Sequence, residues 1–250
     1  MRIESFIYEA QQVALFNITS RFFIDFMNED KIKNQYDFII EEVNETLKKG
    51  IDLKSRQEFI DGMADVFVTS SFASALLSLN PIEYAQTYSN LQFKEKLPIV
   101  NEDNFVALLK NLRELKDKDK ILPQLYALVN FVDEKTADYL YESNSEEYLY
   151  KNKNLTVMEK AIIEVRKSNF SKSIIEKDFS PEQIDYMHKE VINKYHERHN
   201  IQPVKNLGYI TFLSDNGIGK ILKPDTFKEP DLEWTNDVSD VDFFLNLKTD

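Results

Sequence analysis

The sequence contains no cysteine, only 5 glycines and only 7 prolines among its 250 residues. Without cysteine there are no disulfide bonds and no zinc sites with cysteine ligands, and the composition fits a reducing compartment. Sandwiches, barrels and dinucleotide-binding α/β folds depend on many tight turns, which glycine and proline usually supply. The scarcity of both residues therefore favours a helical protein.

Long apolar runs and clustered positive charge are also missing. No stretch reaches the roughly 18 apolar residues that a membrane span requires, and the first residues, MRIESFIYEAQQ, do not read as a signal peptide. A net charge of −12 argues against binding to nucleic acid or to an anionic membrane. We expect a cytoplasmic protein. The negative charge fits either a site that gathers carboxylates around cations or simple solubility.

Apolar residues recur at helical spacing over most of the chain. This periodicity predicts helices at about 3–30, 34–48, 55–79, 103–117, 120–142, 156–168 and 181–199. Lys48, Lys49 and Gly50 are typical of a helix end, and Ser180 with Pro181 is typical of a helix start. Beyond residue 200 only a short strand is expected, at 207–213. We predict an all-α fold with a helical-bundle core in residues 1–215 and an extended C-terminal arm at 216–250.

Two clusters of acidic residues stand out on neighbouring predicted helices. The first comprises Glu41, Glu42 and Glu45, and the second Glu58, Asp61 and Asp65. Spacings of three and four residues place side chains on one face of a helix. A short connection around Gly50 would fold the two helices back as an antiparallel pair. Four or five carboxylates could then meet at one place.

Such a cluster is unfavourable without cations, because neighbouring carboxylates repel one another. Magnesium prefers carboxylate oxygens and leaves coordination positions for phosphates. A solvated acidic face is the simpler reading of the same spacing. Asp61 and Asp65, however, lie within an otherwise apolar helix, and buried acids need partners. This context favours a metal site.

The acidic motifs resemble the ExxE … ExxD signature of the all-α nucleoside triphosphate pyrophosphohydrolases, the MazG-like and dimeric dUTPase-like superfamily. The run from Glu58 to Thr69 is especially similar to phage-encoded members. Residues 164–172, EVRKSNFSK, resemble the segment EVHRSNMSK of that group, with Arg166 and Phe170 as departures. Residues 219–224 and 229–232 resemble a later segment, GKVxKxPxxxxPDL. Two stretches, about 82–155 and 173–215, are longer than usual.

The resemblance implies magnesium-dependent attack of water on the α-phosphorus, which yields a nucleoside monophosphate and pyrophosphate. Manganese is a possible substitute for magnesium. It implies metal binding by Glu42, Glu45, Glu58, Asp61 and Asp65. One of Glu41, Glu42 and Glu45 would orient the attacking water, and the sequence leaves open which. The implied catalytic residues are Glu41, Glu42 and Lys172.

Basic and amide side chains downstream are the candidates for substrate binding. Lys172, Lys220 and Lys223 would hold the phosphates, and Asn169 would bind the base or sugar. Each lysine also fits a solvated surface, and Asn169 also fits a helix cap. Candidate rings for stacking on a base are Phe16, Phe22, Phe23, Tyr36 and Trp234, although each of them fits a core better than a site.

The resemblance also implies a homodimer or homotetramer. We further hypothesise that the 216–250 arm reaches a neighbouring subunit. Two other readings stay open, a non-catalytic module that binds a nucleotide or a partner, and an unrelated helical scaffold with an acidic face. A carboxylate-bridged di-iron bundle needs E-x-x-H pairs, and this sequence has none. The three histidines, His188, His196 and His199, read as members of a polar surface helix.

Overall fold

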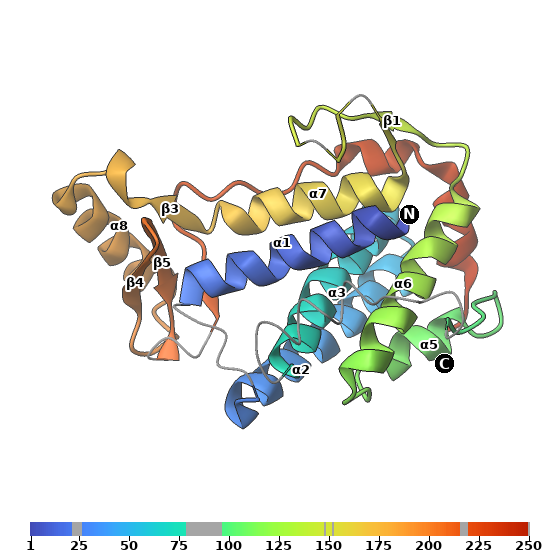
Figure 1. Cartoon of the computed structure of the whole chain (residues 1–250), viewed down its shortest axis with the longest axis horizontal. Helices are drawn as coiled ribbons and strands as arrows, with labels where there is room; N and C mark the ends of the chain where they lie inside the picture. Colours follow the sequence, from blue (N-terminus) through green and yellow to red (C-terminus); the bar gives the residue numbers. More distant parts are fainter. Residues whose placement is uncertain (22–26, 79–96, 148, 152, 216–219, 250) are drawn as a thin grey trace.

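The computed structural model describes residues 1–21, 27–78, 97–147, 149–151, 153–215 and 220–249. The protein is mostly helical, with 60% of its residues in helices and 9% in strands. Long helices form one body, and a small sheet with its own helix lies at one end (Figure 1). The predicted predominance of helix is confirmed. The small sheets mean that the fold is not purely all-α as predicted.

The central layer consists of α1 (Ile3–Arg21), α2 (Glu29–Glu45) and α3 (Arg56–Leu76). Asn28 caps α2 by accepting from the Lys31 backbone N–H, and Ser55 caps α3 by accepting from Glu58 N–H. Between the two helices the chain does not stop at Gly50 as the sequence predicts. It continues as a π-helix, η1 (Thr46–Asp52). The helices still fold back as an antiparallel pair, joined by a hydrogen bond from Gln35 Nε2 to the Thr69 carbonyl (2.8 Å).

Two glycines allow α3 to approach the chain that precedes it. A Cβ added to Gly62 would lie 2.2 Å from Thr46 Oγ1, and one added to Gly50 would lie 2.7 Å from the Phe59 Cα. Thr46 Oγ1 itself donates to the Glu42 carbonyl at 2.7 Å. The missing side chain at Gly62 therefore sets the distance between the helix that carries Glu42 and the helix that carries Asp65.

We expect Gly62→Ala to be destabilising despite the better helix propensity of alanine. The added methyl group must displace Thr46, and overpacking of this kind costs about 1–3 kcal/mol against about 1 kcal/mol gained from propensity. Urea denaturation measures the difference. Adding Thr46→Ala removes the closest clashing atom and should recover part of the loss. No recovery in the double variant would show that the contact with Thr46 is not the cause.

The core is built around α3, whose apolar residues face every neighbouring element. Buried side chains on α3 include Phe59, Ile60, Met63, Val66 and Phe67. By length and composition α3 could also cross a membrane, but 78% of its most apolar 18-residue window is buried inside this protein. That burial is what a core helix requires, and it explains why the helix is apolar on most sides.

The segment between the acidic motifs and the downstream motifs contributes to the same core. It contains α5 (Phe105–Asn111) and α6 (Lys118–Lys135), whose Phe105, Leu109, Leu122 and Leu128 belong to the main apolar cluster. Residues 79–96, which include the beginning of the longer stretch expected at about 82–155, lie outside the described residues. This stretch, predicted as an insertion, is therefore part of the folded body where it is described.

Helix α7 (Val157–Phe170) leads from the helical body to the sheet, with a capping box between Thr156 and Glu159. The sheet has β5 (Tyr209–Leu213) at its centre, antiparallel to β3 (Ser173–Ile175), β4 (Gln202–Asn206) and β6 (Ile221–Leu222). Helix α8 (Pro181–Lys194) packs on it through Ile184, Met187 and Val191. A separate pair joins β1 (Tyr141–Glu142) to β2 (Asn154–Leu155). A three-residue 3-10 turn, η3 (Glu176–Asp178), precedes α8. The strand predicted at 207–213 is confirmed as β5.

The end of the chain is not the extended arm that the sequence predicts. After β6, residues form two 3-10 segments, η5 (Glu233–Asp237) and η6 (Ser239–Asn246). Leu232, Val238, Val241, Phe244 and Leu245 are buried in the main core of the same chain. Arg56, at the start of α3, holds Asp242 through two hydrogen bonds of 2.6 Å. The final segment therefore completes the helical body.

Candidate functional site

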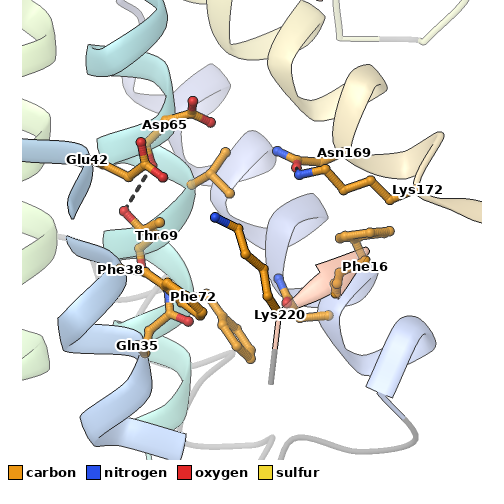
Figure 2. Close-up of a pocket in the computed structure, with 13 residues that line it drawn as sticks. Phe16, Gln35, Phe38, Glu42, Asp65, Thr69, Phe72, Asn169, Lys172 and Lys220 are labelled. Atoms are coloured by element: carbon orange, nitrogen blue, oxygen red, sulfur yellow. Dashed lines mark hydrogen bonds between the residues drawn. The ribbon is translucent and has the colours of Figure 1, made fainter. Parts of the chain in front are cut away.

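A pocket opens between the helical body and the sheet, and five of the predicted site residues line it. It has about 620 Å³ of empty space, part of it open to solvent. The walls come from α1, α2, α3, the end of α7 and the start of β6. The lining residues are Phe16, Asn17, Gln35, Phe38, Glu42, Asp65, Val68, Thr69, Phe72, Asn169, Lys172, Lys220 and Ile221. Figure 2 shows Glu42 and Asp65 on one side, with the amino groups of Lys172 and Lys220 pointing toward them.

The other predicted acids lie around this pocket without lining it. Glu41 lines a neighbouring groove, where Lys220 approaches it at 3.6 Å. Glu45 is exposed and paired with Lys49 at 2.8 Å, and Glu58 is exposed at the start of α3. Asp61 is half-buried one turn before Asp65. Within the described ranges, no group of three or more acids or histidines is close enough to hold a metal ion by itself. The preformed pair is Glu42 and Asp65.

Glu42, Asp61 and Asp65 are half-buried, and their carboxylate oxygens have no hydrogen-bond or ion-pair partner among the described residues. Burial raises the pKa of Glu42 to about 7, and Glu41 and Glu45 add to the shift. Burial also raises the pKa of Asp65 to about 7, with Glu42 as the next cause. The pKa of Asp61 rises to about 7 for the same reason, with Asp65 and Glu58 contributing. The acids therefore form a row of mutually repelling groups, as the sequence predicts.

The facing wall carries the predicted basic residues. Lys172 follows α7, donates to Asn169 Oδ1, and has its pKa lowered by burial first and by Lys223 and Lys220 next. Lys220, just before β6, lies 5.9 Å above the Phe38 ring. Lys223 is outside the pocket lining, bonded to Glu229 at 3.0 Å and lying 4.2 Å above Phe227. Positive charge on Lys172 nevertheless lowers the pKa of both Glu42 and Asp65, which places it within electrostatic reach of the acids.

Arg166, one of the departures from the family pattern, points away from the pocket. It is buried and binds Glu9 at 2.6 Å and Glu147 at 2.9 Å. Burial raises the pKa of Glu9 to about 7, although Arg166 opposes the shift. Arg166 thus anchors α7 to α1 and has no direct place in the site. The other departure, Phe170, stacks on Phe16 at 5.0 Å.

Several lining residues were not predicted from the sequence, although the helical spacing indicates some of them. Gln35 and Phe38 precede Glu42 by two turns and one turn on α2, and Thr69 and Phe72 follow Asp65 similarly on α3. Extending the same helix faces would have found them. Asn17 and Ile221 carried no such signal.

The other candidates for stacking and metal binding are placed elsewhere. Among the proposed stacking rings that the structure describes, only Phe16 lines the pocket. Tyr36 bonds the Leu115 carbonyl, and Trp234 packs on Tyr141 at 4.6 Å. Phe22 and Phe23 lie outside the described residues. His188 bonds the Ile201 carbonyl at 3.0 Å and stacks on Phe212, and His196 and His199 are exposed.

No family model, curated protein or solved structure matches this chain. The function must therefore be argued from the site itself.

The raised pKa values predict an unusual dependence of stability on pH in metal-free protein. An acid whose pKa is higher in the folded state stabilises the fold fully below its unfolded value, near 4 to 4.5. That contribution is lost as the pH rises through the folded value, here about 7 for Glu42, Asp61 and Asp65.

We expect the melting temperature to fall by several degrees between pH 5 and pH 8, with on the order of 1 kcal/mol or more lost per carboxyl group. Magnesium should reverse much of the loss by screening the acids, and calorimetry with and without magnesium would measure both effects. Asp65→Asn should flatten the profile. A profile that is the same in wild type and variant would contradict this assignment.

Proposed function

We propose that this chain is a magnesium-dependent nucleoside triphosphate pyrophosphohydrolase. The observation that carries the proposal is one pocket in which the unpartnered carboxylates of Glu42 and Asp65 face Lys172 and Lys220. Phosphoryl transfer requires carboxylates that hold cations and, opposite them, ammonium groups that bind phosphate oxygens. The resemblance of the motifs to the all-α pyrophosphohydrolases supports the same conclusion.

The residues present fit a magnesium site. Magnesium is usually held by one or two carboxylates together with waters and substrate phosphates, so a pair of acids is sufficient. Glu42 and Asp65 would hold it, with Asp61 one turn away and Glu45 and Glu58 nearest the solvent. When bound, the metal neutralises charge on the phosphates and lowers the pKa of a bound water.

Side chains of the pocket would perform the other steps of the reaction. Of Glu41, Glu42 and Glu45, only Glu42 lines the pocket, so Glu42 is the carboxylate placed to orient the attacking water and to receive its proton. The water oxygen bonds to the α-phosphorus, and the bond from that phosphorus to the bridging oxygen breaks. Lys172 and Lys220 would stabilise the charge that develops on the departing pyrophosphate. Asn169 positions Lys172 through its amide oxygen.

The test is release of monophosphate and pyrophosphate from a panel of ribo- and deoxynucleoside triphosphates, with and without magnesium or manganese. We expect metal-dependent formation of monophosphate and pyrophosphate in equal amounts. Glu42→Gln should abolish it, and Glu29→Gln, the same change at an exposed position on the same helix, should not. Release of orthophosphate instead would place the cleavage elsewhere and overturn the proposal.

Folded protein without turnover on any nucleotide would favour the non-catalytic module that binds a nucleotide or a partner. The resemblance also implies a homodimer or homotetramer, which sedimentation would test. It further suggests a phage-encoded enzyme that acts on the nucleotides of its host.

A further inference from the structure

Of the three lysines expected to hold phosphates, Lys223 alone lies outside the pocket lining. Its ammonium group donates to both carboxylate oxygens of Glu229, at 3.0 and 3.4 Å, and lies 4.2 Å above the Phe227 ring. The side chain of Glu229 is 71% exposed. An ion pair this exposed contributes little to stability, so another anion can replace Glu229 on Lys223 at small cost.

The turn that follows Lys223 is attached to the wall of the pocket. The Lys228 N–H donates to Ser171 Oγ at 2.9 Å, and Ser171 directly precedes Lys172 at the end of α7. The ammonium group of Lys172 lies 5.9 Å from the Phe227 ring, on which Lys223 also lies. The turn therefore holds Lys223 near Lys172, which lines the pocket.

The pocket has an aromatic end and a charged end. On α3, Phe72 follows Asp65 by two helical turns, whereas Asp61 precedes it by four residues, which is about 6 Å in the opposite direction. On α2, Phe38 precedes Glu42 by one turn and so lies at the same end as Phe72, because the helices are antiparallel. Figure 2 shows both rings below the two pocket acids. Asp61 therefore marks the end away from the rings.

Lys223 and Glu229 lie at this charged end. Burial is the first cause of the raised pKa of Asp61, and among the neighbouring charges Glu229 adds to the shift and Lys223 opposes it. The pair is therefore within electrostatic reach of Asp61. Aromatic rings suit a base and ammonium groups suit phosphates. A nucleotide with its base at the aromatic end and its α-phosphorus at Glu42 and Asp65 directs its outer phosphates toward Lys223.

We propose that Lys223 binds the outermost phosphate of the substrate in exchange for Glu229, and that this contact selects triphosphates over diphosphates. The inference rests on the proposed function for the position of the α-phosphorus. Lys172, inside the lining, serves the inner phosphates, and a third phosphate extends beyond the lining to Lys223. A diphosphate lacks the group that makes this contact, so it leaves Lys223 paired with Glu229.

The experiment compares the triphosphate that is hydrolysed fastest with its matching diphosphate, in the presence of magnesium. Lys223→Met should lower kcat/KM for the triphosphate about tenfold more than for the diphosphate, because only the triphosphate loses a charge-assisted contact. Lys223→Arg keeps the charge and should keep most of the preference. Lys228→Met, the same change at an exposed position of the same turn, should leave the ratio unchanged. An equal effect of Lys223→Met on both substrates would contradict the proposal.

Glu229→Gln tests the exchange itself. It frees Lys223 without removing it, so we expect the KM for the triphosphate to fall about two- to fivefold. Asp225→Asn removes an equal charge from an exposed position of the same turn and should lower the KM less. A higher KM in Glu229→Gln would show that Glu229 orients Lys223 for binding, and it would overturn the exchange.

Equilibrium binding of non-hydrolysable α,β-imido analogues separates this inference from the proposed function. The probes are the analogues of dATP, dGTP, dCTP and dUTP and of the matching diphosphates. A preference for triphosphates that Lys223→Met removes, without turnover of any nucleotide, would refute the function and support this role of Lys223. Turnover with an unchanged preference in Lys223→Met would refute the role and support the function. Failure of every analogue to bind would overturn the inference directly.

Discussion

Asp65→Asn is expected to abolish turnover and to raise the melting temperature in the same protein. Asp65 lines the pocket, lacks a hydrogen-bonding partner for its carboxylate within the described part of the chain, and has its pKa raised to about 7 by burial and by Glu42. A neutral amide of the same shape removes an unpaired charge and its repulsion with Glu42, so the folded state becomes more stable. It also removes an oxygen charge that a cation needs. We expect turnover to fall at least about 100-fold and the melting temperature at pH 8 to rise by a few degrees.

Steady-state kinetics and calorimetry on the same preparation provide the measurement. Glu29→Gln is the control, because it removes an equal charge from an exposed site in the first turn of α2. Full activity in Asp65→Asn would show that Asp65 takes no part in catalysis. No turnover in either protein, together with a raised melting temperature in the variant, would support the unrelated scaffold with an acidic face. A joint loss of activity and stability would mean that Asp65 is structural, which the present geometry does not predict.

Phe244→Ala is expected to have the largest effect on stability. Its ring is fully buried, stacks on Phe59 at 4.9 Å, and contacts Phe105 at 5.0 Å and Phe131 at 5.8 Å. Removing a ring from such a cluster costs about 3–5 kcal/mol, or on the order of 10 °C in melting temperature for a chain of this size. The neighbouring Phe243→Ala should cost less, because Phe243 is only partly buried.

The same experiment tests where the end of the chain belongs. If residues 232–247 pack on their own core, the loss in Phe244→Ala is independent of protein concentration. If they were exchanged between subunits, the melting temperature would depend on concentration. For the same reason, a truncation near residue 215 should unfold the protein and not merely change its assembly.

The sequence predicted the helices well where their signals are local. The acids three and four residues apart on α2 and α3 and the Ser180–Pro181 start depend on nearby residues, and both are found in the structure. The final segment does not follow the period of 3.6 residues that predicts an α-helix. Val238, Val241 and Phe244 recur every three residues, which is the period of a 3-10 helix.

Strand β4 was not predicted either. Pro203 argues against a strand, yet among the described strands β4 pairs with β5 alone, and an edge position tolerates proline. In the site, periodicity predicted which acids share a helix face. It did not predict which of them line the pocket, because that depends on how α2 is rotated against α3 and on residues more than 100 positions downstream. Lys172 and Lys220 were expected only from the resemblance, and the structure brings both to the acids.

Lys172, Lys220 and Lys223 cluster beside the pocket in a chain whose net charge is −12. At physiological ionic strength salt screens the field of these lysines beyond about 8 Å, so an approaching molecule feels little attraction from them at larger distances. At longer range and low salt, the whole surface repels an anion, so encounter with a free nucleotide is slowed and added salt accelerates it. A nucleotide that arrives already complexed with a divalent cation carries less negative charge and meets a smaller barrier. If the proposed function holds, this distribution of charge favours binding of the metal-loaded nucleotide kinetically, before any contact in the pocket is made.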